Sequence, residues 1–564
     1  SNGGGLASLT GSPNSLFTGA MTLGAANASN GRGGVVTVST TSGAISTKGN
    51  FAYGLVAQSI AGGGGVSQVV TNSASLGGKN GAAITTNGVG AIGIVAQSIG
   101  GGGGLAIATG SATLGGGTGV ASTGGNVTIT SNAAISTSGV NAIGILAQSV
   151  GGGGGAVLSS GSALSTATTR GAAGNSGAVT VNVNASITTS GKGGYGVVAQ
   201  SVAGGGGLVM NGNTAVLSSA GSGGTSGVVT VNVRKGVSIT TTGAGASAIY
   251  AFSSTDPVLN IEEGASVIGG VGGHAALLDS PINQVNNYGS MSTLDGAAGI
   301  AVKSLSGDTS ILNGGTLLGS IALKDGATNL LHNLAGGTIQ SGSSIDLGGT
   351  GRFQNDGILT NASGIGSVLI NGAFTQSATG TMQIGVDHQS GRSDTFNILG
   401  AAQLDGTLAI RTVNAGSVRP GSFKLAGIVS AADGLAAQGL TLSAARSAIL
   451  NYALSTEGGV ISLISTANFA PDGLSGAGAE IGKAFGAIQA QGGSLLSRRF
   501  TASLVGLDST QKLEDAYKTV GAGGISIVPN QVLSSAQRSV QSVTDRLDGW
   551  RADTGPAGAK RLWL

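Results

Sequence analysis

One short segment combines the side-chain types of a serine hydrolase. It holds serine, histidine and aspartate within eight residues, at Asp387, His388, Ser390, Ser393 and Asp394. The members of a catalytic triad usually come from separate segments of a chain, and they are recognised by their geometry. A turn between two strands accounts better for serine and aspartate at such close spacing. We therefore expect this segment to be a turn without a catalytic residue.

Carboxylates and histidines elsewhere give no stronger candidate. Glu262 and Glu263 are adjacent, and adjacent side chains of a strand point to opposite faces, which argues against a paired acid and base. The three histidines, His274, His332 and His388, lie far apart, and none has metal-ligand spacing. No G-x-S-x-G elbow is present. We therefore expect no catalytic, cofactor-binding or metal-binding residue and no cofactor.

The uneven distribution of charge excludes several functions. All 22 acidic residues lie after residue 255, whereas seven of the 25 basic residues precede that point. The first 255 residues also contain no histidine, and the whole chain contains no cysteine, so this half has no carboxylate pair, no histidine base and no side-chain metal cluster. Its basic residues are scattered, whereas a nucleic-acid site needs clustered lysine and arginine. We expect no nucleic-acid partner.

The same half contains a phrase that recurs four times. It reads GLVAQSIAGGGG, GIVAQSIGGGGG, GILAQSVGGGGG and GVVAQSVAGGGG, and its glutamines are Gln58, Gln97, Gln148 and Gln200. Their spacings of 39, 51 and 52 residues indicate structural units that bury their apolar faces by stacking on each other. A degraded fifth copy has Phe252 in place of glutamine. The opening SNGGGLASL looks like the end of a preceding copy, so we expect residue 1 to lie inside a longer protein.

Two further elements keep the same period. An isoleucine in a short Ile-Ser or Ile-Thr stretch recurs in step with the glutamines, at Ile45, Ile84, Ile135, Ile187 and Ile239. A valine-rich stretch precedes it in most copies, and it starts at Val35, Asn126, Ala178 and Val228. The copy of 39 residues lacks this stretch. We therefore expect that copy to have lost one strand and turn of about 12 residues, the difference between the two periods.

These stretches predict the fold class. Short runs of valine, isoleucine and threonine bounded by glycine, asparagine and serine are typical of strands, and valine alternates from Val179 to Val183. Glycine-rich chains are often flexible linkers, but 40% hydrophobic and 8% charged residues argue against disorder. The sequence predicts an all-β fold, namely a right-handed parallel β-helix (β-solenoid). Whether the glycine runs are flexible loops projecting from the coil stays open.

A looser pattern follows from about residue 285 to residue 365. Asparagines recur there at spacings of 26, 20 and 22 residues, at Asn287, Asn313, Asn333 and Asn355. These spacings are close to one coil of a β-helix. Asn-Gly and Asn-x-Gly pairs also suit tight turns with positive φ. We therefore expect the solenoid to continue with shorter coils and asparagine turns.

Two parts of the sequence resemble autotransporter passengers, which Gram-negative bacteria secrete by the type V route. The AQSIGGGGG repeats are similar to those of large glycine-rich members. A second region resembles the autochaperone or junction segment of the family. The matching features are the stretch FTQSATGTMQ from Phe374, the pair Ser393-Asp394, the motif L-x-G-T-L at 404–408 and the turn at Pro420. The lack of cysteine also fits a chain that crosses membranes unfolded.

The C-terminal part extends this resemblance. Helical patches occur between Gly473 and Lys518. Apolar residues at spacings of 3 and 4 predict a further helix from Asn530 to Arg551, with its seam at Val532, Ala536, Val540, Val543, Leu547 and Trp550. The resemblance implies that this helix threads the translocation barrel and that the final KRLWL begins the first barrel strand.

The resemblance implies four parts and a function. The parts are glycine-rich repeats (1–255), a β-helix with shorter coils (256–370), an autochaperone-like β segment (371–466) and a helical linker with the first residues of an outer-membrane barrel (467–564). The expected protein is a non-catalytic passenger at the cell surface, an adhesin-like stalk whose C-terminal segment promotes secretion and folding. Its expected partners are its own translocator barrel, the outer membrane through that barrel, and ligands on host or bacterial surfaces.

Two other interpretations stay open. In the first, the chain is the scaffold of an autotransporter enzyme that acts on polysaccharides, and the catalytic part lies outside this chain. In the second, the chain is a spacer whose length matters and whose sequence does not.

Overall fold

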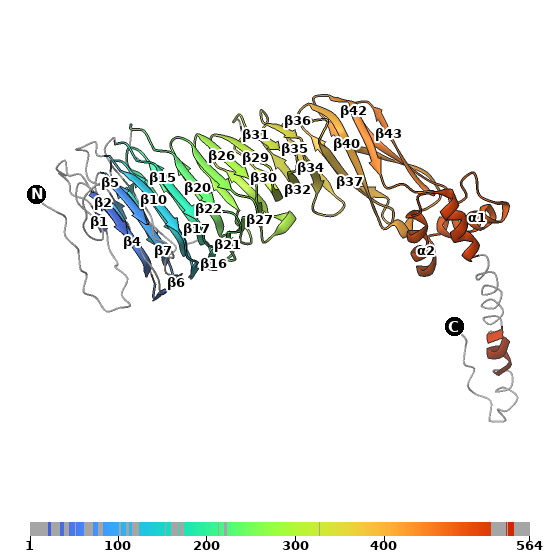
Figure 1. The fold of residues 1–564 in the computed structure, drawn as a ribbon, viewed down its shortest axis with the longest axis horizontal. Helices are drawn as coiled ribbons and strands as arrows, with labels where there is room; N and C mark the ends of the chain where they lie inside the picture. The colour runs from blue at the N-terminus through green and yellow to red at the C-terminus, as the bar shows by residue number, and fades with distance from the viewer. Residues whose placement is uncertain are drawn as a thin grey trace, which may run out of the picture.

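The computed structural model is an elongated stack of strands that ends in a helical region (Figure 1). The structure describes residues 21–23, 34–38, 44–50, 52–60, 72–76, 83–100, 103–108, 112–114, 123–152, 154–159, 168–169, 174–211, 214–218, 223–325, 327–520, 537–538 and 540–545. In this part of the chain, 37 strands join into one continuous sheet, and nearly all of them pair in parallel with the equivalent strand one coil away. The predicted parallel β-helix is therefore confirmed.

Face 1 of the solenoid contains the valine-rich stretches. Its strands are β2 (Gly34–Val38), β5 (Asn72–Leu76), β10 (Asn126–Ser131), β15 (Val179–Val183), β20 (Val229–Val233), β23 (Pro257–Ile261), β26 (Ile282–Asn287), β29 (Asp308–Asn313), β31 (Leu330–Asn333), β33 (Arg352–Asn355), β36 (Ala373–Gln376), the start of β40 (Ala402–Val413) and the start of β42 (Leu435–Ala444). In β15 every second residue is buried, so valines fill the core while Thr180 and Asn182 face outwards.

Face 2 contains the isoleucine stretches. Its strands are β3 (Ala44–Lys48), β6 (Ala83–Asn87), β11 (Ile135–Ser138), β16 (Ile187–Thr189), β21 (Ser238–Thr241), β24 (Ser266–Gly269), β27 (Ser290–Thr293), the start of β30 (Thr316–Ala322), the start of β32 (Thr338–Asp346), β34 (Ile358–Asn361), β37 (Thr381–Asp387) and the ends of β40 and β42. The repeated isoleucines stand in register from Ile45 to Ile239, one above the other. The predicted repeat alignment is thereby confirmed for this element.

Face 3 contains the glutamine strands. Its strands are β4 (Tyr53–Ile60), β7 (Ile92–Ile99), β12 (Ile143–Val150), β17 (Tyr195–Val202), β22 (Ser247–Ser253), β25 (Ala276–Leu278), β28 (Ile300–Ser304), the ends of β30 and β32, β35 (Ser367–Asn371), β39 (Thr395–Ile398), β41 (Gly421–Ala431), β44 (Val460–Ala467) and β43 (Leu450–Glu457). Gln58, Gln97, Gln148 and Gln200 occupy the same register, and Phe252 takes the next place.

A second sheet covers the outer side of face 3 in the repeats. This cover sheet follows the glycine runs and consists of β8 (Gly103–Ala108), β13 (Gly154–Ser159), β18 (Gly206–Asn211) and β19 (Thr214–Ser218). A further small sheet holds β1 (Met21–Leu23), β9 (Ala112–Leu114) and β14 (Thr168–Thr169). Every residue of β7, β12 and β17 is consequently buried.

The two layers enclose a second hydrophobic core. Val95, Leu146 and Val198 point out of face 3 and pack with Leu105 and Leu208 of the cover sheet, apart from the main core inside the coil. A strand that is buried on both sides has no need to alternate, which explains the continuous apolar run before each glutamine.

The expected loss of a strand from the copy of 39 residues is wrong. β5, with the sequence NSASL, occupies the face-1 position of that coil and pairs in parallel with both β2 and β10. The 30 residues from Gln97 to Val127, a residue of β10, include β8 and β9. The equivalent segment from Gln58 to Ala74 is 16 residues long, so the shorter copy has lost length between the glutamine strand and the next face-1 strand. The sequence did not predict NSASL as a strand because this stretch lacks valine and isoleucine.

The C-terminal end of the solenoid changes from parallel to antiparallel pairing. β41 pairs with β44 and β44 with β43, all antiparallel, and helices follow them in chain order. The helices are α1 (Gly476–Ala490), α2 (Leu495–Val505) and a helical segment at 510–520, which confirms the predicted helical patches. Within the described residues, no helix combines the length and apolar character required to cross a membrane.

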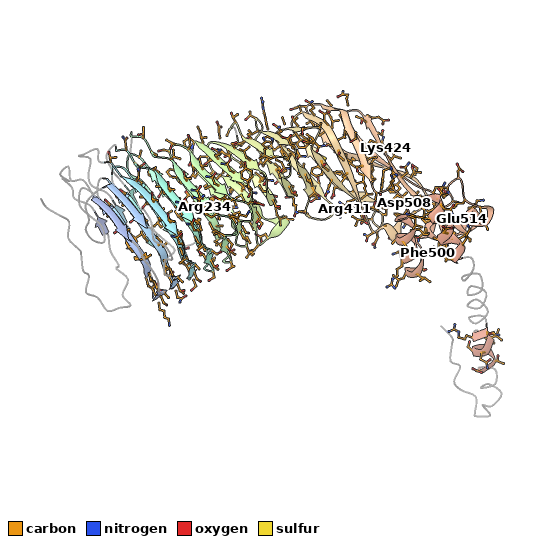
Figure 2. All side chains as sticks on the ribbon, viewed as in Figure 1. Arg234, Arg411, Lys424, Phe500, Asp508 and Glu514 are labelled. Carbon is orange, nitrogen blue, oxygen red and sulfur yellow. The ribbon has the colours of Figure 1, made fainter. Side chains whose placement is uncertain are left out.

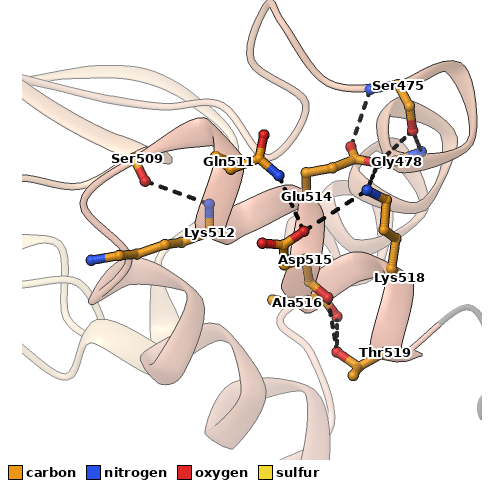
Figure 3. A network of polar contacts seen from close by, with 10 residues as sticks. All are labelled: Ser475, Gly478, Ser509, Gln511, Lys512, Glu514, Asp515, Ala516, Lys518 and Thr519. Carbon is orange, nitrogen blue, oxygen red and sulfur yellow. Dashed lines mark hydrogen bonds and ion pairs between the residues drawn. The ribbon is translucent and has the colours of Figure 1, made fainter.

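A polar network joins the last of these helices to the first (Figure 3). Ser475 caps α1 by accepting a hydrogen bond from the N–H of Gly478 at 3.1 Å. The Ser475 hydroxyl in turn donates to Glu514 Oε1 at 2.6 Å, and its N–H donates to Oε2. These hydrogen bonds lower the pKa of Glu514 despite the opposing effect of burial. Of the helix predicted from Asn530 to Arg551, residues 537–538 and 540–545 are helical, and the rest, like KRLWL, lies outside the described residues.

Candidate functional site

The repeated glutamine forms a buried ladder through the stack. Each Nε2 donates to Oε1 of the glutamine one coil on: Gln58 to Gln97, Gln97 to Gln148 at 2.7 Å, and Gln148 to Gln200 at 2.6 Å. Gln97, Gln148 and Gln200 have no exposed surface. Buried amides without partners would cost free energy, and stacking identical side chains satisfies them along the ladder.

Gln148 also contacts the glycine run of its own repeat. Gln148 Nε2 makes a second hydrogen bond, to the carbonyl oxygen of Gly155 at 2.9 Å. Gly155 belongs to β13, the cover strand that follows the same glutamine in the chain. The glutamine therefore lies between face 3 and the cover sheet and links the two layers.

The last two glycines of each described run begin a strand of the cover sheet, and the described glycines before them form bends. Gly154 and Gly155 have φ angles of +136° and +140°, a region that side chains rarely adopt. A Cβ on Gly154 would lie 1.9 Å from the carbonyl oxygen of Gly206 in the next coil. The backbones thus stack so closely that only glycine fits, and the alternative of flexible loops is wrong for these residues.

The serine after each glutamine ties successive coils together. Ser149 Oγ accepts from the N–H of Gly177 at 2.8 Å and donates to the carbonyl oxygen of Gly125 at 2.9 Å. Ser201 makes the same two contacts one coil on, with Gly227 and Gly177. Both polar residues of the A-Q-S part, the glutamine and the serine, therefore form hydrogen bonds that hold the stack together.

Phe252 ends the glutamine ladder. It pairs in register with Gln200, whose Nε2 has no hydrogen-bond partner among the described residues. The Phe252 ring packs against the small apolar cluster that contains Val150 and Val202. No glycine run follows Phe252 in the sequence. The glutamine therefore disappears from the solenoid together with the glycine run that it would hold.

A ladder of asparagines runs through the shorter coils. Asn287 donates to Asn313 at 2.7 Å, Asn313 to Asn333 and Asn333 to Asn355 at 2.8 Å, and Asn355 to Gln376 at 3.1 Å. All five side chains are fully buried at the ends of face-1 strands. The expected tight turns are present, because bends at 288–289, 314–315 and 356–357 follow three of these asparagines, but the positive φ expected there is wrong, since Gly289, Gly314 and Gly357 do not adopt it.

A third ladder lies on the outer surface of face 1 and was missed by the sequence analysis. Asn232 donates to Asn182 at 2.9 Å, Asn260 to Asn232 at 2.8 Å and Asn286 to Asn260 at 2.8 Å. These side chains are partly exposed. Asparagine at the second-last position of VTVNV, VTVNV, PVLNI and INQVNN was the signal that could have revealed this row.

The Ser-His-Asp segment is a hairpin turn between β37 and β38 (Arg392–Ser393), as predicted. Asp387 accepts hydrogen bonds from Ser390 Oγ at 2.6 Å and from Asn414 Nδ2 at 2.7 Å. Burial raises the pKa of Asp387, but these donors and two backbone N–H groups outweigh it and lower the pKa to about 2. This carboxylate therefore stabilises the turn.

His388 and Asp394 have separate partners. His388 Nε2 pairs with the hydroxyl of Tyr452 at 2.8 Å, and burial lowers the pKa of this histidine. Asp394 is fully buried and accepts from the N–H of Gly385 at 2.6 Å and from Asn361 Nδ2 at 3.0 Å. Burial raises its pKa, and its hydrogen bonds oppose that shift. These hydrogen bonds do not arrange serine, histidine and aspartate as a triad.

Glu262 and Glu263 follow β23, so their placement on a strand is wrong. They form ion pairs with the coil below, Glu262 with Arg234 at 2.7 Å and Glu263 with Lys235 at 3.0 Å (Figure 2 labels Arg234). All four side chains are exposed to solvent. The described residues contain no group of three or more His, Cys, Asp or Glu side chains that could hold a metal ion.

The fold and its ladders define a parallel β-solenoid built from stacked repeats. No protein-family model matches this chain, and no curated protein matches it either. The ladders, the outer polar surface and the C-terminal end are therefore the features from which a function must be argued.

Proposed function

We propose that this chain is a non-catalytic passenger of an autotransporter, displayed at the bacterial cell surface as an adhesin-like stalk. The observation that carries the proposal is the order of its parts: a long solenoid with few charged residues, then an antiparallel end, then helices. This is the order that the sequence resemblance implies. The proposed location is the outer membrane, with the passenger outside the cell.

The solenoid suits a stalk for physical reasons. Each coil contacts its neighbours through backbone ladders and amide ladders, so length can increase by whole repeats without a new core. The cover sheet thickens the repeat half with a second hydrophobic core. A stack of this kind presents a long, regular surface that contains few charged residues.

The proposed adhesive surface is the outer side of face 1 in the repeats. It bears the asparagine row of Asn182, Asn232 and Asn260 and a row of threonines that includes Thr180 and Thr230. Many weak contacts along a periodic surface add up through multivalency. The proposed partners are ligands on host or bacterial surfaces, together with the translocator barrel of the same protein and, through it, the outer membrane. No nucleic acid is proposed as a partner.

The first experiment tests surface display. Antibodies against residues 174–211 are applied to intact cells that produce the protein from its own gene, and external protease is added in parallel. We expect labelling of intact cells that protease removes. Labelling only after cell lysis would refute the proposed location.

The second experiment separates adhesion from spacing. One variant lacks residues 149–200, which is a single repeat of 52 residues. The deletion joins Gln148 directly to Ser201, so the next coil stays in register. A second keeps full length but replaces Asn182, Asn232 and Asn260 by lysine. We expect the lysine variant to lose most adhesion or autoaggregation and the shortened variant to keep most of it. The reverse result would favour a spacer. Unchanged adhesion in both would contradict an adhesive role for this face.

A further inference from the structure

The last strand of faces 1 and 2 has a free edge. β42 pairs in parallel with β40, and no other described strand pairs with it. Its ten residues, LAAQGLTLSA, contain no proline and no charged residue, the devices by which natural edge strands prevent further pairing. Its unpaired backbone N–H and C=O groups can therefore accept another strand.

A groove lies beside this edge. The side chains of Leu440 and Leu442 pack on the main core but remain half-buried. Leu442 is in register with Leu408, which is fully buried one coil earlier. A cavity of about 340 Å³ adjoins Leu442, and its lining combines Leu450 and Tyr452 with polar residues that include Asp508, which forms an ion pair with Lys512 at 3.0 Å. The solenoid core is thus open here, at the place where another coil would cover it.

We propose that the β42 edge binds an extended polypeptide strand from another chain, in parallel orientation, with apolar residues at every second position. The ladder from β33 through β36 and β40 to β42 is parallel throughout, and an added strand would continue it. Its main chain would supply the hydrogen bonds, and its inward side chains would fill the groove over Leu440 and Leu442. Charged inward side chains would be disfavoured directly over Leu440 and Leu442, which are apolar and pack on the core.

Arg446 makes the two ends of the bound strand chemically different. This exposed residue lies two positions after β42 and lines the same cavity. A parallel partner ends beside Arg446, whereas an antiparallel partner begins there. An acidic residue at the C-terminal end of the bound strand would therefore meet a guanidinium group.

The test uses the purified full chain and a fluorescent peptide, GAVTVNVNAS, which copies residues 177–186 and has the required alternation. Two versions carry an added C-terminal glutamate or lysine, and a third is N-methylated at alternate residues. Fluorescence anisotropy measures binding. We expect saturable 1:1 binding, at least tenfold weaker for the N-methylated peptide. The glutamate version should bind more tightly than the lysine version, and Arg446→Glu should reverse that preference.

Protein variants locate the site. Gln438→Lys with Ser443→Lys places two charges at exposed positions of β42, and we expect it to weaken binding at least tenfold. The matched control is Thr375→Lys with Gln403→Lys, at exposed positions of β36 and β40, whose two edges are both paired. The control should bind like the unmodified protein.

Three results would overturn the proposal. The first is no saturable binding by the unmodified protein, and the second is equal binding by the β42 variant. The third is a dimer in sedimentation velocity that the β42 variant abolishes, because a second copy would then occupy the edge.

Discussion

The two halves of the solenoid stabilise the same coil in different ways. In the repeats, face 3 is buried on both sides, and Gln148 of the glutamine ladder connects it to the cover sheet. In the coils after residue 256, face 3 is open to solvent on its outer side, where Leu277 and Leu369 are partly exposed, and the buried amides are asparagines at the ends of face-1 strands. The longer amide is used where two layers must be bridged. The shorter one is used where a single coil must be held, except at the end of that ladder, where Asn355 donates to Gln376.

The largest effect should come from the closely stacked glycines of the repeats. Gly154→Ala adds a Cβ at 1.9 Å from a backbone oxygen and also strains φ, so we expect a loss of about 4 kcal/mol in the local free energy of opening. Gly236→Ala is the control, because its φ is also positive but nothing lies within 4 Å; its cost should be about 1 kcal/mol. Hydrogen exchange of β13 and β18 measures the first and that of β21 the second. Equal costs would show that the close stacking does not matter.

The two buried ladders should differ in their sensitivity to loss of an amide. Gln148→Leu removes one hydrogen bond from each of three groups: Gln97 Nε2, Gln200 Oε1 and the Gly155 carbonyl. We expect about 3 kcal/mol of local destabilisation.

Asn313→Leu is the corresponding change in the other half. It should cost about 2 kcal/mol, because Asn333 Oδ1 loses its donor, whereas Asn287 Nδ2 keeps the Thr316 carbonyl and the Gly315 carbonyl keeps the N–H of Thr338. Hydrogen exchange of the cover strands and of β29 compares the two variants. A larger loss for Asn313→Leu would contradict the bridging role of the glutamines.

Acid should affect the two halves differently. Burial lowers the pKa of His388 below that of an exposed histidine, and the neighbouring Asp387 opposes this only in part. The unfolded chain therefore binds the proton first, so stability is full above about pH 6.5 and falls as the pH drops through and below that value. His274 shows the same direction of shift. The first 255 residues contain neither acidic residues nor histidine.

Hydrogen exchange at pH 7 and pH 5, corrected for the intrinsic exchange rate, measures this difference. We expect loss of protection in β40 and β43, which surround His388, and none in β12 and β17. His388→Gln should remove most of the loss around β43. A uniform loss across both halves would refute the assignment.

The smallest effect should come from the ion pairs at the junction of the halves. Arg234 and Glu262 are 46% and 38% exposed, so solvent screens their attraction, and Glu262→Gln should cost about 0.5 kcal/mol or less. Thermal denaturation at low and high salt measures this cost. A large shift that persists at high salt would show that the pair organises the junction.

Particular residues show how far the sequence could predict this structure. Repetition located Gln148 and the isoleucines of face 2, and alternation identified β15 and β20. NSASL was missed as a strand because its place depends on pairing with β2 and β10, and its composition gives no signal. Asn313 does stand beside the bend at 314–315, as asparagine before glycine favours, but its burial in a ladder depends on stacked coils and has no signal in the local sequence.

The sequence by itself determined the period, the strand type and the absence of acidic residues from the first half, because these depend on residue order and composition alone. Only the tertiary structure decided that the glycine runs form a second layer, that the glutamines face that layer and that β42 ends with an open edge. The reason is physical: partners 50 residues apart meet only when coils stack, and neither an amide ladder nor a free edge exists until they do.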